Sequence, residues 1–186
     1  MPIELEELLK KNLQDEVIVF PTDTVYGIGC LLNSRHGVER IFKLKGREQD
    51  KPLAVLCPDI ESAQSLSANF EDFEHLAKKH WPGALTLVVE KSEQVPDFVT
   101  RGKSTVGLRI PDHNKALAIL KRFGPMAVTS LNRSSEPSVL TYRDALAFKD
   151  RVDHIVSGGD LSGVASTVFD TKQGVTLRQG NVRLKR

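Results

Sequence analysis

Short apolar runs and amphipathic segments alternate along the chain, and this pattern predicts helices and strands that are intermixed from end to end. In the amphipathic segments apolar residues recur every three or four positions, the spacing of one helix face. Asp59 and Thr141 are suitable N-caps, and Gly46 and Gly124 are suitable helix ends. The predicted helices are 3–13, 38–46, two within 59–80, 114–123 and 141–148.

Runs of four to seven mostly apolar residues predict buried strands. These strands are 17–20, 26–32, 53–56, 85–89, 105–110 and 126–129, with short strands joined by turns in 167–184. Intermixed helices and strands indicate an α/β fold with a twisted, mixed (parallel and antiparallel) sheet. Gly27 and Gly29 lie inside a predicted strand, which suggests a bulge or the close approach of another group.

The 186 residues, 40% of them hydrophobic, can bury one sizeable core, so we expect a single domain over 1–186. The charged, amphipathic N-terminus does not resemble a signal peptide, and no apolar run is long enough to span a bilayer. The expected location is therefore the cytoplasm. The net charge of +2 is far from the strong basic excess typical of nucleic-acid-binding proteins.

Cys30 and Cys57 belong to no CxxC pair, and the five histidines show no metal-ligand spacing. We expect two reduced core thiols and no metal site built by the protein. The GxxxxGK[ST], GxGxxG and GxSxG patterns are also absent. If the chain binds a nucleotide, it does so by a less common scheme.

Four cations gather within nine positions around the end of one predicted helix: Lys43, Lys45, Arg47 and Lys51. Cations at a helix C-terminus ordinarily complement the helix dipole and face water. Here, however, the segment leads through Pro52 into a buried strand, and ligands of open α/β sheets bind at strand ends. Arginine as a planar fork and lysine as a point charge would together suit a polyphosphate.

Polar residues also lie at the ends of predicted strands: Thr22-Asp23-Thr24, Ser130 to Asn132, and Ser166. Such residues can simply form turns. Alternatively, 22–24 could hold an ammonium group and a hydroxyl, and 130–132 could bind phosphate or ribose. Arg109 is the only charge in the run 106–111, so it either meets a buried carboxylate or points into a cavity that takes a carboxylate ligand.

Several short motifs occur in a fixed order: FPTDTVYG at 20–27, KGR at 45–47, KPL at 51–53, WPGALT at 81–86, VGLRIP at 106–111, SLN at 130–132, STV at 166–168 and LR at 177–178. In this order they resemble the YrdC-like threonylcarbamoyl-AMP synthases, over about residues 16–180. The resemblance implies a twisted mixed sheet around a large, positively charged cavity.

The resemblance also implies a reaction in which L-threonine, bicarbonate and ATP give threonylcarbamoyl-AMP and pyrophosphate. Separate transferase proteins then modify the tRNA adenosine next to the anticodon. Threonine carbamate would attack the α-phosphate without a covalent enzyme intermediate, and Mg²⁺ would be held largely by the phosphates.

Each site residue implied by the resemblance has a role. The ATP contacts are Lys45, Arg47, Lys51, Ser130, Asn132, Ser138 and Arg178, of which Lys45 and Arg47 are also catalytic because they stabilise the developing charge. The threonine contacts are Thr24, Arg109 and Ser166, with Arg109 on the carboxylate. Asp23 is a candidate for orienting the amine.

Three positions depart from the usual pattern: Leu56 replaces a histidine, Leu131 a small residue, and Ser135 a glycine. We also expect no additional C-terminal domain of the kind found in longer members, because the chain ends soon after Arg178. Two alternatives stay open. One is an RNA-binding module that uses the basic cavity on tRNA or double-stranded RNA, and the other is a carbamoyl-adenylate domain of another pathway.

Overall fold

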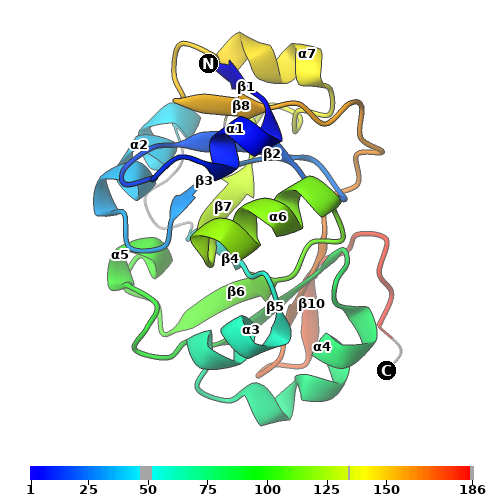
Figure 1. Cartoon of the computed structure of the whole chain (residues 1–186). Coiled ribbons are helices and arrows are strands. Elements are labelled where there is room, and N and C mark those ends of the chain that lie inside the picture. The colour runs from blue at the N-terminus through cyan, green and yellow to red at the C-terminus, as the bar shows by residue number, and fades with distance from the viewer. Residues whose placement is uncertain (47–51, 134, 185–186) are drawn as a thin grey trace.

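The computed structural model describes residues 1–46, 52–133 and 135–184, and ten strands in these ranges form one sheet (Figure 1). The strands are β1 (Pro2–Ile3), β2 (Ile18–Pro21), β3 (Tyr26–Leu31), β4 (Ala54–Leu56), β5 (Leu85–Glu90), β6 (Thr105–Arg109), β7 (Met126–Ser130), β8 (His154–Val156), β9 (Thr167–Asp170) and β10 (Val175–Arg178). Their order across the sheet is β1-β8-β2-β3-β7-β4-β6-β5-β9-β10.

The sheet is mixed, as the sequence predicts. Parallel pairs are β1/β8, β2/β8, β4/β6 and β5/β9, whereas the other neighbours run antiparallel. The helices are α1 (Leu5–Leu9), α2 (Arg35–Lys45), α3 (Ile60–Leu66), α4 (Glu74–His80), α5 (Asp97–Thr100), α6 (Asn114–Phe123) and α7 (Tyr142–Ala145), with 3₁₀ turns at Phe70–Asp72 and Leu146–Phe148. The prediction of an α/β fold is confirmed.

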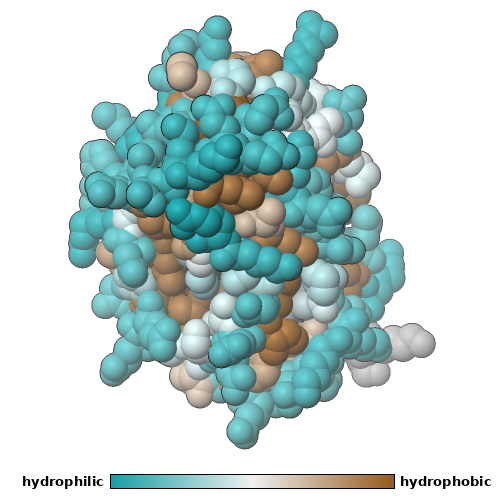
Figure 2. Space-filling view, in the orientation of Figure 1, coloured by the Kyte–Doolittle hydropathy of each residue, from teal (hydrophilic) through white to brown (hydrophobic). Residues whose placement is uncertain are grey.

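Because side chains alternate along a strand, β2, β4 and β8 each contribute to two separate hydrophobic clusters. Val17 and Val19 pack in a larger cluster with α2, whereas Ile18 and Phe20 pack in a smaller one with α1 and α6. The larger cluster extends to α3 and α4, which lie at the end of the sheet that carries β5 and β6 (Figure 1). Both clusters consist of buried residues, and the surface seen in Figure 2 is largely hydrophilic.

The opening segment differs from its prediction. We expected a helix over 3–13, but Pro2–Ile3 forms β1, which pairs with β8, and α1 covers only Leu5–Leu9. A two-residue strand carries no local periodicity and is fixed by a partner about 150 residues away. The short β8 and α5 were likewise not predicted.

The predicted caps agree with the structure. The Asp59 carboxylate accepts a hydrogen bond from the Ser62 amide at 2.7 Å, and the Thr141 hydroxyl accepts one from the Asp144 amide at 3.1 Å. Gly46 closes α2 with a φ of 58°, a left-handed conformation that glycine adopts without strain. In the described ranges, no helix is long and apolar enough to cross a membrane.

The two cysteines are buried and unpaired, as predicted. Burial raises the pKa of the Cys30 thiol to about 12, and that of Cys57 also rises. Because the thiolate is the reactive form, both groups should be inert in the folded protein.

We predict almost no reaction with Ellman's reagent at pH 8 until guanidinium unfolds the chain, after which two thiols per chain should react. Rapid reaction of the native protein would contradict the packing around these residues.

Candidate active site

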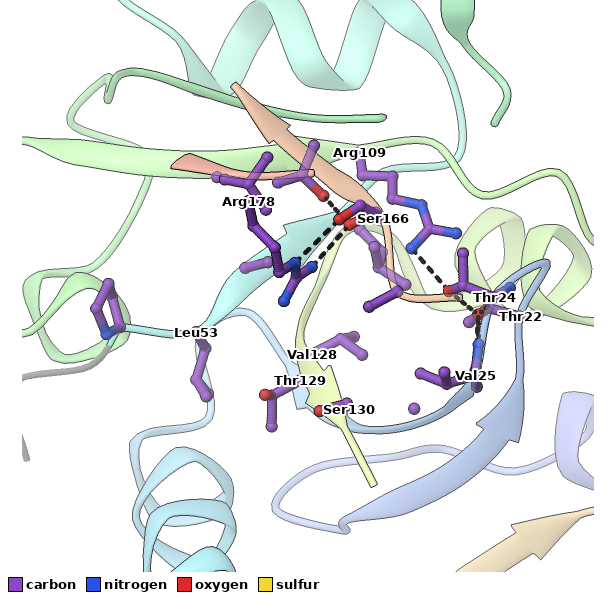
Figure 3. Close-up of a pocket in the computed structure, with 18 of the residues that line it drawn as sticks. Thr22, Thr24, Val25, Leu53, Arg109, Val128, Thr129, Ser130, Ser166 and Arg178 are labelled. Carbon is purple, nitrogen blue, oxygen red and sulfur yellow. Dashed lines mark hydrogen bonds between the residues drawn. The ribbon is translucent and has the colours of Figure 1, made fainter. Parts of the chain in front are cut away.

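A cavity of about 320 Å³ opens on one face of the central strands (Figure 3). Alternate residues of three adjacent strands contribute to its wall, because side chains two apart point to the same face: Ala54 and Leu56 of β4, Gly107 and Arg109 of β6, and Thr86 and Val88 of β5. The β2–β3 turn, β7, the segment before β9, and β10 complete the wall with Thr22, Thr24, Ser130, Ser166 and Arg178.

Arg109 ends β6 and is held by three groups of the protein. Its Nε donates to the Gly83 carbonyl at 3.0 Å, its Nη1 donates to Thr24 Oγ1 at 3.1 Å, and its Nη2 donates to the Asp23 carboxylate. The Arg109 side chain is buried, with 8% exposure, and that of Asp23 is partly buried, with 15% exposure. Three of the five guanidinium N–H donors are thus engaged by described residues, which leaves one N–H each on Nη1 and Nη2.

The turn that presents Thr24 is organised by Thr22. The Thr22 hydroxyl donates to the Val25 carbonyl at 2.7 Å and accepts from the Thr24 and Val25 amides. Since its proton is used there, the 3.0 Å contact between the two threonine hydroxyls has Thr24 as the donor. Thr24 Oγ1 therefore accepts from Arg109 while it donates to Thr22.

A second cluster of polar side chains centres on Ser166. Arg178 donates from Nε to the Ser166 carbonyl at 3.0 Å and from Nη2 to Ser166 Oγ at 3.1 Å. Thr86 Oγ1 lies 2.8 Å from Ser166 Oγ. Figure 3 shows Ser166 between the two arginines, so one hydroxyl separates two guanidinium groups at the cavity wall.

The two arginines differ in their electrostatic surroundings. Burial lowers the pKa of Arg109, Asp23 opposes that effect, and Arg178 adds to it. Burial also lowers the pKa of Arg178. No carboxylate in the described part of the chain forms an ion pair with Arg178, whereas Arg109 has Asp23. Among the described residues, one arginine of the cavity therefore has a carboxylate partner and the other has none.

Lys45 is buried at the end of α2, although a cation in that position would ordinarily face water. Its Nζ donates to the Ser130 carbonyl at 2.8 Å and to Asn132 Oδ1 at 2.9 Å. The Asn132 amide in turn donates to the carbonyls of Arg133 and Glu136 at 2.8 and 2.9 Å. Through these hydrogen bonds Lys45 links the end of β7 and the following loop to α2.

The structure brings five of the predicted site residues to one cavity: Thr24, Arg109, Ser130, Ser166 and Arg178. Lys45 and Asn132 do not line it but hydrogen bond to each other directly behind Ser130. Ser138 is half-buried on the 131–140 loop and is not among the lining residues. Arg47 and Lys51 lie outside the described residues.

Three residues of the site have roles that the sequence left open or did not reveal. Arg109 was expected either to meet a carboxylate or to point into a cavity, and it does both. Asp23 was a candidate for orienting an amine, but its carboxylate pairs with Arg109 and the residue does not line the cavity. The role of Thr86 was not recognised, although a lone hydroxyl in the apolar strand 85–89 was an available signal.

The three unusual positions have clear structural settings. Leu56 lines the cavity, so an apolar side chain stands where the resemblance expects a histidine. Leu131 is fully buried in the larger hydrophobic cluster. Ser135 has a φ of 70°, the left-handed conformation that favours the expected glycine.

A mixed sheet whose face carries a cavity lined by two arginines and several hydroxyls defines an α/β protein with a pocket suited to a small polar ligand. The chain belongs to the Sua5/YciO/YrdC family, whose model, described as "Telomere recombination", matches residues 10–180.

Two proteins named threonylcarbamoyl-AMP synthase, from Pyrococcus abyssi and Bacillus subtilis, are each 39% identical to this chain. The matches cover 92% and 94% of this chain, respectively, but only 52% of each relative, so the chain spans about half their length. A crystal structure of P. abyssi Sua5 complexed with L-threonine is 35% identical with a TM-score of 0.91, covering 97% of this chain and 57% of that one.

The contact between Thr86 and Ser166 can be tested apart from any activity. Thr86→Val keeps the side-chain shape but removes one hydrogen-bond partner of Ser166, so we predict a loss of about 1 kcal/mol in the free energy of unfolding. Thr176→Val on the exposed face of β10 is the control and should change it by less than about 0.5 kcal/mol. Equal urea midpoints for Thr86→Val and the unmodified protein would argue against this contact.

Proposed function

We propose that this protein is an L-threonylcarbamoyladenylate synthase in which residues 1–186 act as one domain. It joins L-threonine, bicarbonate and ATP into threonylcarbamoyl-AMP and releases pyrophosphate. The product would serve the threonylcarbamoyl modification of the tRNA adenosine next to the anticodon, in the cytoplasm, through separate transferase proteins. Direct binding of tRNA or double-stranded RNA is not needed for this step.

The observation that carries the proposal is the convergence of Thr24, Arg109 and Ser166 on one cavity that Ser130 and Arg178 also line. Two free N–H donors of Arg109 match the two oxygens of an α-carboxylate. The Thr24 hydroxyl, which donates to Thr22 and accepts from Arg109, keeps one lone pair that can accept from the rest of a small polar amino acid. The Ser166 hydroxyl, which contacts Arg178 and Thr86, likewise keeps one position for such a ligand. The relatives' name and the L-threonine complex of P. abyssi Sua5 support this assignment.

The chemistry needs placement and charge stabilisation more than a protein nucleophile. The amine of threonine meets bicarbonate to form a carbamate with loss of water, and a carbamate oxygen then displaces pyrophosphate from the α-phosphate of ATP. In this proposal Arg178 and Ser130 lie on the nucleotide side of the cavity with Arg47, Lys51 and Ser138. Lys45 and Asn132 hold Ser130 in position and can turn toward phosphate when the nucleotide binds.

Mg²⁺ would accompany ATP as part of the substrate. In the described ranges, no group of three His, Cys, Asp or Glu side chains could hold a metal ion. The phosphate oxygens would therefore supply most of the ligands of the ion, whose role is to neutralise charge on the pyrophosphate that leaves.

The activity is tested by pyrophosphate release from ATP. We predict release that requires both L-threonine and bicarbonate and that stops when either is omitted. Arg109→Ala should lower the rate by roughly 100-fold or more because the amino acid loses its carboxylate partner. Arg47→Ala should cause a similar loss.

Arg143→Ala, which removes an exposed arginine of α7, is the matched control and should retain full activity. Thermal melting of each variant separates loss of activity from loss of folding. Release that ignores threonine would overturn the proposed reaction, and full activity in Arg109→Ala would overturn the residue assignment. Steep loss of RNA binding with added salt, without any response to threonine, would favour the RNA-binding alternative instead.

A further inference from the structure

We propose that Asp23 is a specificity-determining residue that reserves the Arg109 end of the cavity for the amino acid and keeps polyphosphate at the Arg178 end. This inference rests on the proposed function, because it assigns the two substrates to two ends of the same cavity. Asp23 would act through Arg109 and not by touching a ligand.

The position of Asp23 supports an indirect role. Its carboxylate accepts from Nη2 of Arg109 and forms a buried ion pair with that guanidinium. Asp23 is not among the residues that line the cavity, whereas its neighbours Thr22 and Thr24 are. Asp23 therefore offsets the charge of Arg109 without lining the cavity itself, and one N–H each of Nη1 and Nη2 is not used by the hydrogen bonds to described residues.

The other arginine has a contrasting environment. Within the described residues, Arg178 hydrogen bonds to neutral groups of Ser166, through Nε and Nη2. No carboxylate of the described residues pairs with it. Arg178 is an exposed residue of β10 that also lines the cavity, so its positive charge is available to an anion there.

Because Asp23 neutralises Arg109 whereas Arg178 has no carboxylate partner among the described residues, ligands of different charge should prefer different arginines. A polyphosphate gains most from the uncompensated Arg178, because near Arg109 it would also meet the negative field of Asp23. An amino acid brings one carboxylate together with a cationic or neutral amine, so it suffers much less from that field. Hydrogen-bond geometry, which Asp23, Thr24 and Gly83 fix, then selects the carboxylate at Arg109.

Removal of the Asp23 charge should therefore create a second anion site. In Asp23→Asn the amide can still accept from Arg109, but the buried guanidinium lacks a counterion, and such a charge recruits an anion. Pyrophosphate would then bind at Arg109 and compete with threonine.

The test is calorimetric titration of the whole chain with L-threonine, in the absence and presence of saturating pyrophosphate. In the unmodified protein, pyrophosphate should change the apparent threonine Kd by less than about twofold. In Asp23→Asn, it should raise that Kd by roughly tenfold, the effect of a competing ion at the same guanidinium. The matched control is Asp112→Asn, which removes an exposed carboxylate three residues after Arg109. It should behave like the unmodified protein.

Asp23→Glu keeps the charge, and provides the test if Asp23→Asn fails to fold. It should weaken threonine binding by moving the guanidinium, yet leave pyrophosphate non-competitive. Competition by pyrophosphate in Asp23→Glu or in the unmodified protein, or its absence from folded Asp23→Asn, would overturn the inference. If the unmodified protein binds no threonine at all, it is the proposed function that fails.

Discussion

A buried arginine has to be satisfied at the end of β6, and much of the site is arranged to meet this requirement. An unpaired charge in such a place would cost several kcal/mol, so its donors must find partners. Arg109 finds them in Gly83, Thr24 and Asp23, which come from two segments about 60 residues apart in the chain. Gly83 is also bonded to the residue after Arg109, because its amide donates to the Ile110 carbonyl at 2.8 Å. One side chain thus joins the β2–β3 turn to the segment before β5.

The same arrangement gives the cavity its chemical asymmetry. At one end a guanidinium is fixed in direction and offset in charge by Asp23. Arg178, by contrast, hydrogen bonds within the described residues to Ser166, whose hydroxyl also contacts Thr86. An acyl-adenylate has a neutral or singly charged half and a phosphate half, and a cavity with these two ends suits such a molecule.

Features that depend on local sequence were predictable. Continuous apolar runs located the central strands, and Asp59 and Thr141 marked helix starts through their side-chain chemistry. The lone charge of 106–111 identified Arg109 as a buried group. Features that depend on distant partners were not predictable: β1 exists because β8 lies beside it, and Lys45 is buried because Ser130 and Asn132 reach it from β7. The ordered motifs indicated which residues share a site, but not that Asp23 faces an arginine.

The central claim is that one cavity holds an amino acid and a nucleotide side by side. The most direct measurement is calorimetric titration with L-threonine in the absence and presence of a non-hydrolysable ATP analogue with Mg²⁺. Two ligands that touch in one cavity order the same side chains, so the account predicts at least about fivefold tighter threonine binding when the analogue is present, and reciprocally for the analogue. Independent binding of the two ligands, or mutual exclusion, would contradict it.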